Sequence, residues 1–326
     1  MANELTVYLH FPCFDGLVSA VLASEYLRRK RAWNLAELVP VGYAERDTWA
    51  SRRLQKPAAV VDFLYHADAD FWADHHQTTF LTPGSKVHFK NRKSAHLFYD
   101  PNALSCASVI WRNTYHSIRN PRFRDMVKWA DRIDGAKYQS IEEAVLGGAP
   151  ALRISFSLLR DPSPEYCRYL FESLRSKSLG EVADSREVTQ RYTSVRREIE
   201  SGQRKFKRSA RLERDGIVVF KVDNSKSSVV SRYAPYFEYP QALYSIGILN
   251  SEKGAKITAM RNPWRHFKSV PLGQIFRSYG GGGHQRVASV LVNSREAEHT
   301  LQSILADLRR ARSSKVAIAK DMVTGD

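Results

Sequence analysis

The chain has 326 residues, of which 43% are hydrophobic and 26% charged, so it is typical of globular proteins and long enough for two domains. No apolar run approaches the roughly 18 residues of a membrane span, so we expect no membrane contact. No secretory signal is recognisable, and three scattered cysteines exclude a disulfide framework, so we expect a cytoplasmic protein. Fifty lysines and arginines against 34 acids give a net charge of +16, which favours phosphates or nucleic acid as partners.

The first half of the chain alternates short apolar runs with segments of helical periodicity. We expect a helix over 14–33, followed by helices over 106–118 and 123–136. Strands are predicted over 5–11, 58–65 and 69–76. This order predicts an α/β fold, a parallel sheet with helices on both faces.

The second half begins with a charge-rich stretch without proline, which predicts a long basic helix that links two domains. Apolar runs then predict strands over 216–224, 241–250, 256–262 and 288–294, before a helix over 297–313. We therefore expect a first domain at 1–185, a helical linker at 186–214, a smaller α/β domain at 215–312 and a tail at 313–326.

Polar side chains follow the predicted strands of the first half. His10, Asp62 and the triplet Asp74-His75-His76 all lie at strand ends, and such ends meet at one edge of a parallel sheet. The triplet alone could be a polar turn. Together with Asp15 and Asp131, however, these carboxylates and imidazoles are enough to ligate two divalent cations that share a carboxylate.

Five short motifs resemble one family in this order along the chain. They read HFPCFDG at 10–16, VVDF at 60–63, ADHH at 73–76, WADRID at 129–134 and GGGGHQRVAS at 280–289. The chain thus resembles the DHH phosphoesterases that carry an attached DHHA1 domain. Relatives in this group include RecJ-type exonucleases, nano-RNases and cyclic-dinucleotide phosphodiesterases.

The resemblance implies a role for each matching residue in the first domain. It implies that Asp62 bridges two ions and that His76 donates to the scissile phosphate, while Asp74 holds the geometry. The implied metal ligands are His10, Cys13, Asp15, Asp62, His75 and Asp131.

Two of these assignments leave alternatives open. Many relatives have an aspartate where this chain has Cys13, so Cys13 is either a ligand that biases metal choice or a small buried side chain. Asp134 is the alternative to Asp131, one helical turn later, and our interpretation favours Asp131.

The resemblance places substrate contacts in the second domain. Consecutive glycines permit positive φ and close approach of the backbone to a phosphate, and arginine suits a bidentate grip. Ser225 and Lys226 are a looser match at the rim of this site. The implied substrate-binding residues are Arg261, Gly281, Gly282, Gly283, His284 and Arg286.

These features predict a metal-dependent phosphodiesterase in which two Mn²⁺ ions, with Mg²⁺, Co²⁺ or Zn²⁺ as alternatives, activate water. The expected substrates are short oligonucleotides or 3′,5′-bisphosphate nucleotides, with longer single-stranded nucleic acid as a further partner and a homodimer left open. The alternatives are a RecJ-like single-strand exonuclease, a cyclic-dinucleotide phosphodiesterase and a nucleic-acid-binding protein that has lost catalysis.

Overall fold

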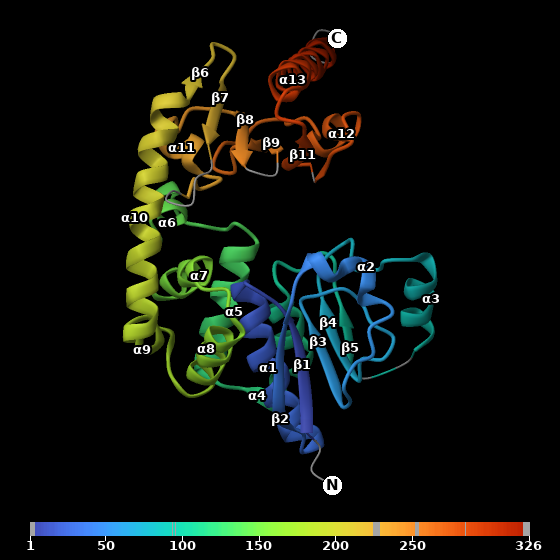
Figure 1. Ribbon diagram of the computed structural model, residues 1–326. Coiled ribbons are helices and arrows are strands. Elements are labelled where there is room, and N and C mark those ends of the chain that lie inside the picture. Colours follow the sequence, from blue (N-terminus) through green and yellow to red (C-terminus); the bar gives the residue numbers. More distant parts are fainter. Residues whose placement is uncertain are drawn as a thin grey trace. The chain divides into compact units, whose positions relative to one another are not determined.

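The computed structural model describes residues 4–92, 94, 96–223, 229–251, 254–283 and 285–321, and it divides the chain into two compact units (Figure 1). The first comprises residues 1–139 and 147–195, and the second residues 140–146 and 196–326. Helix α10 (Arg186–Ser209) contributes to both units, and it covers most of the linker predicted over 186–214. No helix among the described residues is long and apolar enough to cross a membrane.

The first unit is built on a five-stranded, entirely parallel sheet in the order β2-β1-β3-β4-β5, which confirms the predicted fold class. Its strands are β1 (Glu4–His10), β2 (Asn34–Val41), β3 (Ala58–Val61), β4 (Phe71–Asp74) and β5 (Leu97–Tyr99). The helices and the 3-10 turn of this unit are α1 (Phe14–Arg31), η1 (Tyr43–Glu45), α2 (Arg46–Trp49), α3 (Pro83–Asn91), α4 (Cys106–Ile118), α5 (Pro121–Asp134), α7 (Pro150–Arg160), α8 (Pro164–Ser176) and α9 (Leu179–Ala183).

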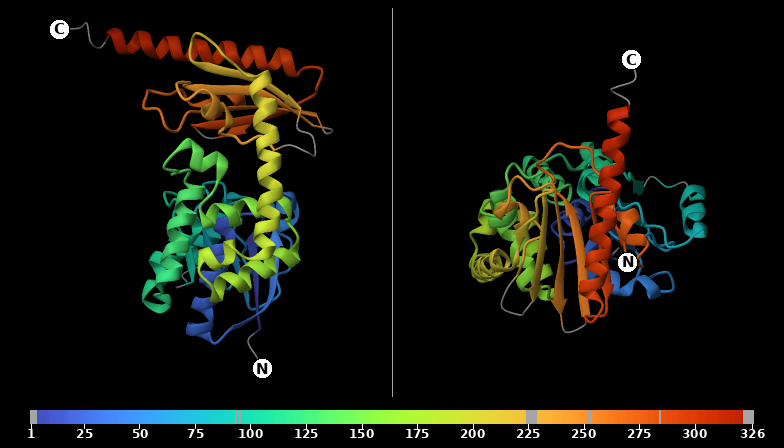
Figure 2. Two further views of the ribbon diagram at one scale, coloured as in Figure 1. Left: turned by 90° about the vertical axis from the view of Figure 1, so that its left-hand side faces the viewer. Right: turned by 90° about the horizontal axis from the view of Figure 1, so that it is seen from above.

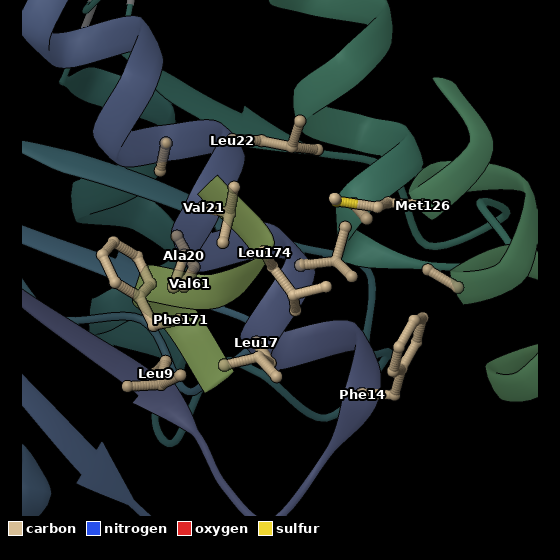
Figure 3. Packing of buried hydrophobic residues seen from close by; sticks show 14 of the residues in the cluster. Leu9, Phe14, Leu17, Ala20, Val21, Leu22, Val61, Met126, Phe171 and Leu174 are labelled. Carbon is tan, nitrogen blue, oxygen red and sulfur yellow. The ribbon is translucent and has the colours of Figure 1, made fainter. Parts of the chain in front are cut away.

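Side chains alternate between the two faces of this sheet, so each face has its own apolar core. Val7 and Leu9 of β1 pack with α1, α4, α5, α7 and α8, and Figure 3 shows the centre of this core, with Leu9 and Val61 near Leu17 and Phe171. Tyr8 of β1 lies in the opposite core, which includes side chains of α2 and α3. Helices therefore cover both faces, as predicted.

The second unit contains a six-stranded sheet in the order β10-β11-β9-β8-β7-β6, in which only the β7–β8 pair is parallel. Helices α12 and α13 cover one face of this sheet (Figure 2), and α13 continues to Asp321, beyond the helix predicted over 297–313. The elements of this unit are α6 (Ile141–Leu146), β6 (Arg211–Leu212), β7 (Ile217–Asp223), α11 (Ala234–Glu238), β8 (Tyr244–Ser251), β9 (Gly254–Arg261), α12 (Leu272–Arg277), β10 (Gly282–Gly283), β11 (Val287–Val292) and α13 (Ala297–Asp321).

Candidate metal centre and substrate-binding region

The polar residues of the first unit meet where the strand order of its sheet reverses. β1 lies between β2 and β3, and ligands of open α/β sheets bind at such a switch point, beyond the carboxyl ends of the strands. His10 is the last residue of β1, and Asp62 directly follows β3. Asp74 ends β4, so His75 and His76 lie at the same edge of the sheet.

Asp62 occupies the middle of this group. Its side chain is 1% exposed, and neither carboxylate oxygen has a hydrogen-bond partner among the described residues. Oδ2 lies 3.4 Å from Nδ1 of His10, and Oδ1 lies 3.7 Å from Nε2 of His75. Because a buried carboxylate without partners is costly, the two oxygens fit ligation of a cation on either side.

His75 directs one ring nitrogen into a cluster of acids. Its Nδ1 lies 3.2 Å from the Ala103 carbonyl oxygen, which can only accept, so Nδ1 carries the proton and Nε2 presents a lone pair. Nε2 is buried without a hydrogen bond among the described residues, 3.7 Å from Oδ2 of Asp15 and 3.3 Å from Oδ2 of Asp134. This tautomer is the one that a metal-ligating imidazole requires.

The N-terminus of α4 holds Asp15 in place. Its Oδ2 accepts from the Cys106 amide at 2.7 Å and its Oδ1 from the Ala107 amide at 2.9 Å, an arrangement that favours the anion. Burial and the neighbouring Asp134 outweigh these bonds and raise the pKa of Asp15 to about 6. A cation between Asp15, His75 and Asp134 would relieve this repulsion.

Two three-residue groups therefore have ligating atoms within 4.8 Å of one another. One consists of His10, Cys13 and Asp62, and the other of Asp15, His75 and Asp134. Burial and the nearby His76 lower the pKa of His10 to about 4, so its imidazole is neutral at pH 7, as ligation requires. The donor sets fit two divalent cations, with Asp62 reaching both groups.

Asp74 fixes the position of the second histidine of the triplet. Its Oδ1 accepts from the backbone amides of His75 at 2.7 Å and His76 at 3.3 Å, and from Nδ1 of His76 at 2.8 Å. Asp62, Asp74, His75 and His76 also lie within 4.8 Å of one another, but the bond to Asp74 already occupies Nδ1 of His76. Asp74 is thus placed to orient His76.

Asp134, rather than Asp131, lies with Asp15 and His75, which differs from our sequence-based preference. Oδ1 of Asp131 accepts from the Ser105 hydroxyl at 2.6 Å, and Ser105 caps α4 by accepting from the Ser108 amide. Asp131 therefore supports the start of α4, whose amides hold Asp15. We correct the proposed ligand set to His10, Cys13, Asp15, Asp62, His75 and Asp134.

This correction predicts different effects for two neighbouring substitutions. Asp134→Asn should weaken Mn²⁺ binding by at least about tenfold, since it removes a proposed ligand. Asp131→Asn should change the affinity by less than about threefold and lower the free energy of unfolding by about 1 kcal/mol, because it weakens a helix-capping contact. Calorimetric Mn²⁺ titration and denaturant unfolding of both variants check this, and equal affinities would contradict the assignment.

Tyr43 is a residue of this site that the sequence reasoning missed. It opens the 3-10 turn after β2 and is 43% exposed, with its ring centroid 5.1 Å from that of His10 and 6.5 Å from that of His76. Burial, then Asp74 and Asp62, raise the pKa of its hydroxyl, which thus stays protonated. β2 pairs with β1, so predicting β2 from the sequence would have placed Tyr43 near His10.

In the second unit, the predicted glycines form a tight turn and a short strand. Gly282 and Gly283 pair with Ser289 and Ala288, and a Cβ on Gly281 would lie 2.6 Å from the Ser289 carbonyl oxygen. Arg286 is exposed beside this strand. His284, Ser225 and Lys226 lie outside the described residues.

Arg261 has a structural position, which differs from the predicted grip on a phosphate. Its side chain is buried, and one guanidinium nitrogen donates to the carbonyls of Arg265 at 2.9 Å and Phe267 at 3.2 Å. A second nitrogen donates to the Asn262 carbonyl, and the guanidinium stacks on the Phe267 ring. Arg261 thus holds the segment after β9.

A cavity of about 310 Å³ lies on the face of this sheet opposite α13. Its polar lining includes Arg232 and Lys256 together with the hydroxyls of Ser231, Ser245 and Thr258. Its apolar lining includes Phe220, Leu249, Met260 and Val287, and Gly282 and Gly283 close one side. The cavity therefore combines an apolar wall with cations, as a nucleotide requires.

No protein-family model matches the sequence, and no curated protein matches it. Solved structures do match. A pGpG-specific phosphodiesterase, PggH from Vibrio cholerae, is 18% identical, with a TM-score of 0.73, over 94% of this chain and 99% of that one. RecJ from Thermus thermophilus in complex with Mn²⁺ is 14% identical, with a TM-score of 0.55, over 94% of this chain and 52% of that one.

A third similar structure is an exopolyphosphatase-related protein from Bacteroides fragilis, 11% identical with a TM-score of 0.53, over 94% of this chain and 92% of that one. A structure described as a DHH domain matches 94% of this chain and 86% of that one, with a TM-score of 0.55 and 11% identity. At these identities the likeness establishes the fold, which confirms the DHH/DHHA1-type fold expected from the motifs.

Proposed function

We propose that the chain is a metal-dependent phosphodiesterase acting on nucleotides, because its fold is of the DHH type and two ligand groups lie on either side of one buried carboxylate. The observation that carries this proposal is Asp62. Its two oxygens have no hydrogen-bond partner among the described residues, and they face His10 on one side and His75 on the other. A bridging carboxylate of this kind is typical of two-metal hydrolytic centres.

The donor types support manganese, cobalt or zinc rather than magnesium as the bound ion. His10, Cys13 and Asp62 would hold one ion, and Asp15, His75 and Asp134, with Asp62, would hold the other. Imidazole nitrogen and a thiol shift the preference from Mg²⁺ toward Mn²⁺, Co²⁺ or Zn²⁺. A pair of such ions supplies hydroxide at neutral pH and neutralises charge on the phosphate oxygens.

His76 and Tyr43 have positions that suit contacts with the substrate. Burial lowers the pKa of His76, but the hydrogen bond to Asp74 and the charge of that carboxylate outweigh burial and raise it. A protonated His76 held through Nδ1 presents Nε2–H as a donor to a phosphate oxygen on which negative charge develops. The exposed ring of Tyr43 offers a surface against the nucleoside next to this phosphate.

A linear dinucleotide or short oligonucleotide is the substrate class we favour. The likeness to a pGpG-specific phosphodiesterase over nearly the whole of both chains supports it. The cavity of the second unit also supports it, because Lys256 and Arg232 can bind a phosphate while Phe220 and Met260 contact a base. We propose that this cavity binds a nucleotide.

The test is an assay of the purified chain with Mn²⁺ on a panel of substrates. The panel contains 5′-phosphorylated linear dinucleotides, a cyclic dinucleotide, a 3′,5′-bisphosphate nucleotide, and RNA and DNA of five and twenty residues. We expect the linear dinucleotides to yield mononucleotides fastest. Preference for the cyclic dinucleotide or the twenty-residue strands would favour the corresponding alternative, and oligonucleotide binding without hydrolysis would favour a non-catalytic binding protein.

A further inference from the structure

A shallow groove lies between α4 and α5 in the first unit, and none of its lining residues belongs to the metal centre. Its volume is about 210 Å³, below the about 300–1,000 Å³ of pockets that enclose a whole small ligand. It therefore suits one nucleotide unit of a longer chain. The lining that matters for binding consists of Trp111, Tyr115, Arg119, Arg124, Asp125 and Lys128.

Two aromatic rings form one wall of the groove. Trp111 and Tyr115 lie one helical turn apart on α4, with ring centroids 5.1 Å apart in an edge-to-face arrangement. Both side chains are half-buried, so part of each ring faces solvent. The Arg119 guanidinium lies over the Tyr115 ring at 5.8 Å. Aromatic side chains backed by arginine are the usual surface on which unpaired bases stack.

The charges of the groove favour an anion. Arg119, Arg124 and Lys128 are exposed, and none forms an ion pair with any described residue, whereas Asp125 is the one acid in the lining. By contrast, Arg112 on the same helix is paired with Asp100. Three cations free of carboxylate partners leave the groove net positive, in a chain that carries +16 overall.

The two helices connect this groove to the metal centre. α4 begins with the Cys106 amide on Asp15, and α5 ends at Asp134. At about 1.5 Å per helical residue, Trp111 and Lys128 lie roughly 8–9 Å along their helices from these ends, and Arg124 lies roughly 15 Å away. At about 3.4 Å per stacked nucleotide, a strand cut at the metal centre needs about five nucleotides to reach Arg124.

We propose that the α4–α5 groove is a second binding site for single-stranded nucleic acid, where bases stack on Tyr115 and Trp111 and phosphates bind Arg119, Arg124 and Lys128. The inference rests on the proposed function for the hydrolysis itself. It extends the expected substrates of the chain to strands of about five or more nucleotides. A dinucleotide is too short to occupy the metal centre and this groove together.

The test compares two double variants of the full chain. Arg124→Gln/Lys128→Gln removes two cations from the groove, and Lys86→Gln/Lys90→Gln removes two exposed cations from α3 in the same unit. Binding of a fluorescent twenty-residue single strand is followed by anisotropy in EDTA, at several salt concentrations. Hydrolysis of a dinucleotide with Mn²⁺ is measured in parallel.

The groove variant should bind the twenty-residue strand about tenfold more weakly, with a salt slope smaller by about 1.4, because two phosphate contacts are lost. It should hydrolyse the dinucleotide at the wild-type rate, and the α3 variant should match the wild type in both assays. Tyr115→Ala should also weaken strand binding at least fivefold, whereas Tyr115→Phe should not.

Unchanged strand affinity in the groove variant, or an equal loss in the α3 variant, would overturn the inference. If the wild type hydrolyses nothing but the groove variant still binds the strand more weakly, the inference about binding stands and the proposed function fails. The two claims are thus tested separately.

Discussion

Replacing Asp62 by asparagine is expected to lower metal-dependent hydrolysis by at least about 10³-fold without weakening the metal-free fold. Each Asp62 oxygen faces one ligand group, so this single change removes a ligand from both proposed ions. Loss of one stabilising group at a reacting centre already costs about 10²–10³-fold, and loss of the shared ligand should cost more.

The same substitution should leave the metal-free protein as stable or more stable. Burial and the neighbouring Asp15, Asp134 and Asp74 raise the pKa of Asp62 well above its ordinary value, so the metal-free fold carries an unfavourable acid there. Asparagine has the same shape and tolerates the positive φ of 56° at this position. A cation bound beside Asp62 would offset the cost of burying this carboxylate near other acids.

Three measurements on the variant check this prediction: the hydrolysis rate, the number of Mn²⁺ ions bound, and the unfolding temperature with and without Mn²⁺. Asp68→Asn, which changes an exposed carboxylate six residues away, is the matched control and should behave as the wild type. A variant that keeps more than a tenth of the activity would show that Asp62 does not link the two groups.

Replacing Gly16 by alanine is expected to disrupt the metal centre through the backbone. A Cβ at this position would lie 2.1 Å from the His10 carbonyl oxygen and 3.3 Å from Oδ2 of Asp62. Because the first contact is with backbone, β1 and α1 would have to move apart. We expect a loss of about 2–3 kcal/mol in the free energy of unfolding and a weakened Mn²⁺ affinity.

Denaturant unfolding and Mn²⁺ titration of Gly16→Ala test this expectation against Gly84→Ala. Gly84 lies in the first turn of α3, where a Cβ would approach no closer than 3.7 Å, to the Thr82 hydroxyl. The control should change the stability by less than about 1 kcal/mol. A Gly16→Ala protein with normal stability and affinity would show that β1 and α1 tolerate a wider separation here.

The burial of each strand explains which strands the sequence predicts. β3, β4 and the middle of β1 are buried on both faces, so they read as continuous apolar runs. Helix α4 shows its periodicity clearly, whereas the first three turns of α1 are buried on all sides. β2 was missed because it is half-exposed and contains Pro40, and the three residues of β5 are only partly buried. Edge strands of this kind carry too little apolar signal.

The residues of the candidate site that follow strand ends were predictable from the sequence. The roles of residues that depend on individual side-chain contacts were harder to predict. The order of strands alone brings His10, Asp62 and His75 together. Asp131 and Asp134 lie one turn apart on α5, and contacts with distant residues distinguish them. Asp131 accepts from the Ser105 hydroxyl, whereas Asp134 lies 3.3 Å from Nε2 of His75. Likewise, the sequence pattern does not indicate that Arg261 donates hydrogen bonds to the carbonyls of residues 262, 265 and 267.

The most direct test of the central claim is a titration of Mn²⁺ into the metal-free chain, with bound metal and dinucleotide hydrolysis measured in the same samples. If Asp62 joins two ions in one catalytic centre, the chain will bind two ions, and the rate will rise only as the second one binds. Full activity with one ion per chain, or two bound ions without hydrolysis of any nucleotide substrate, would contradict the account.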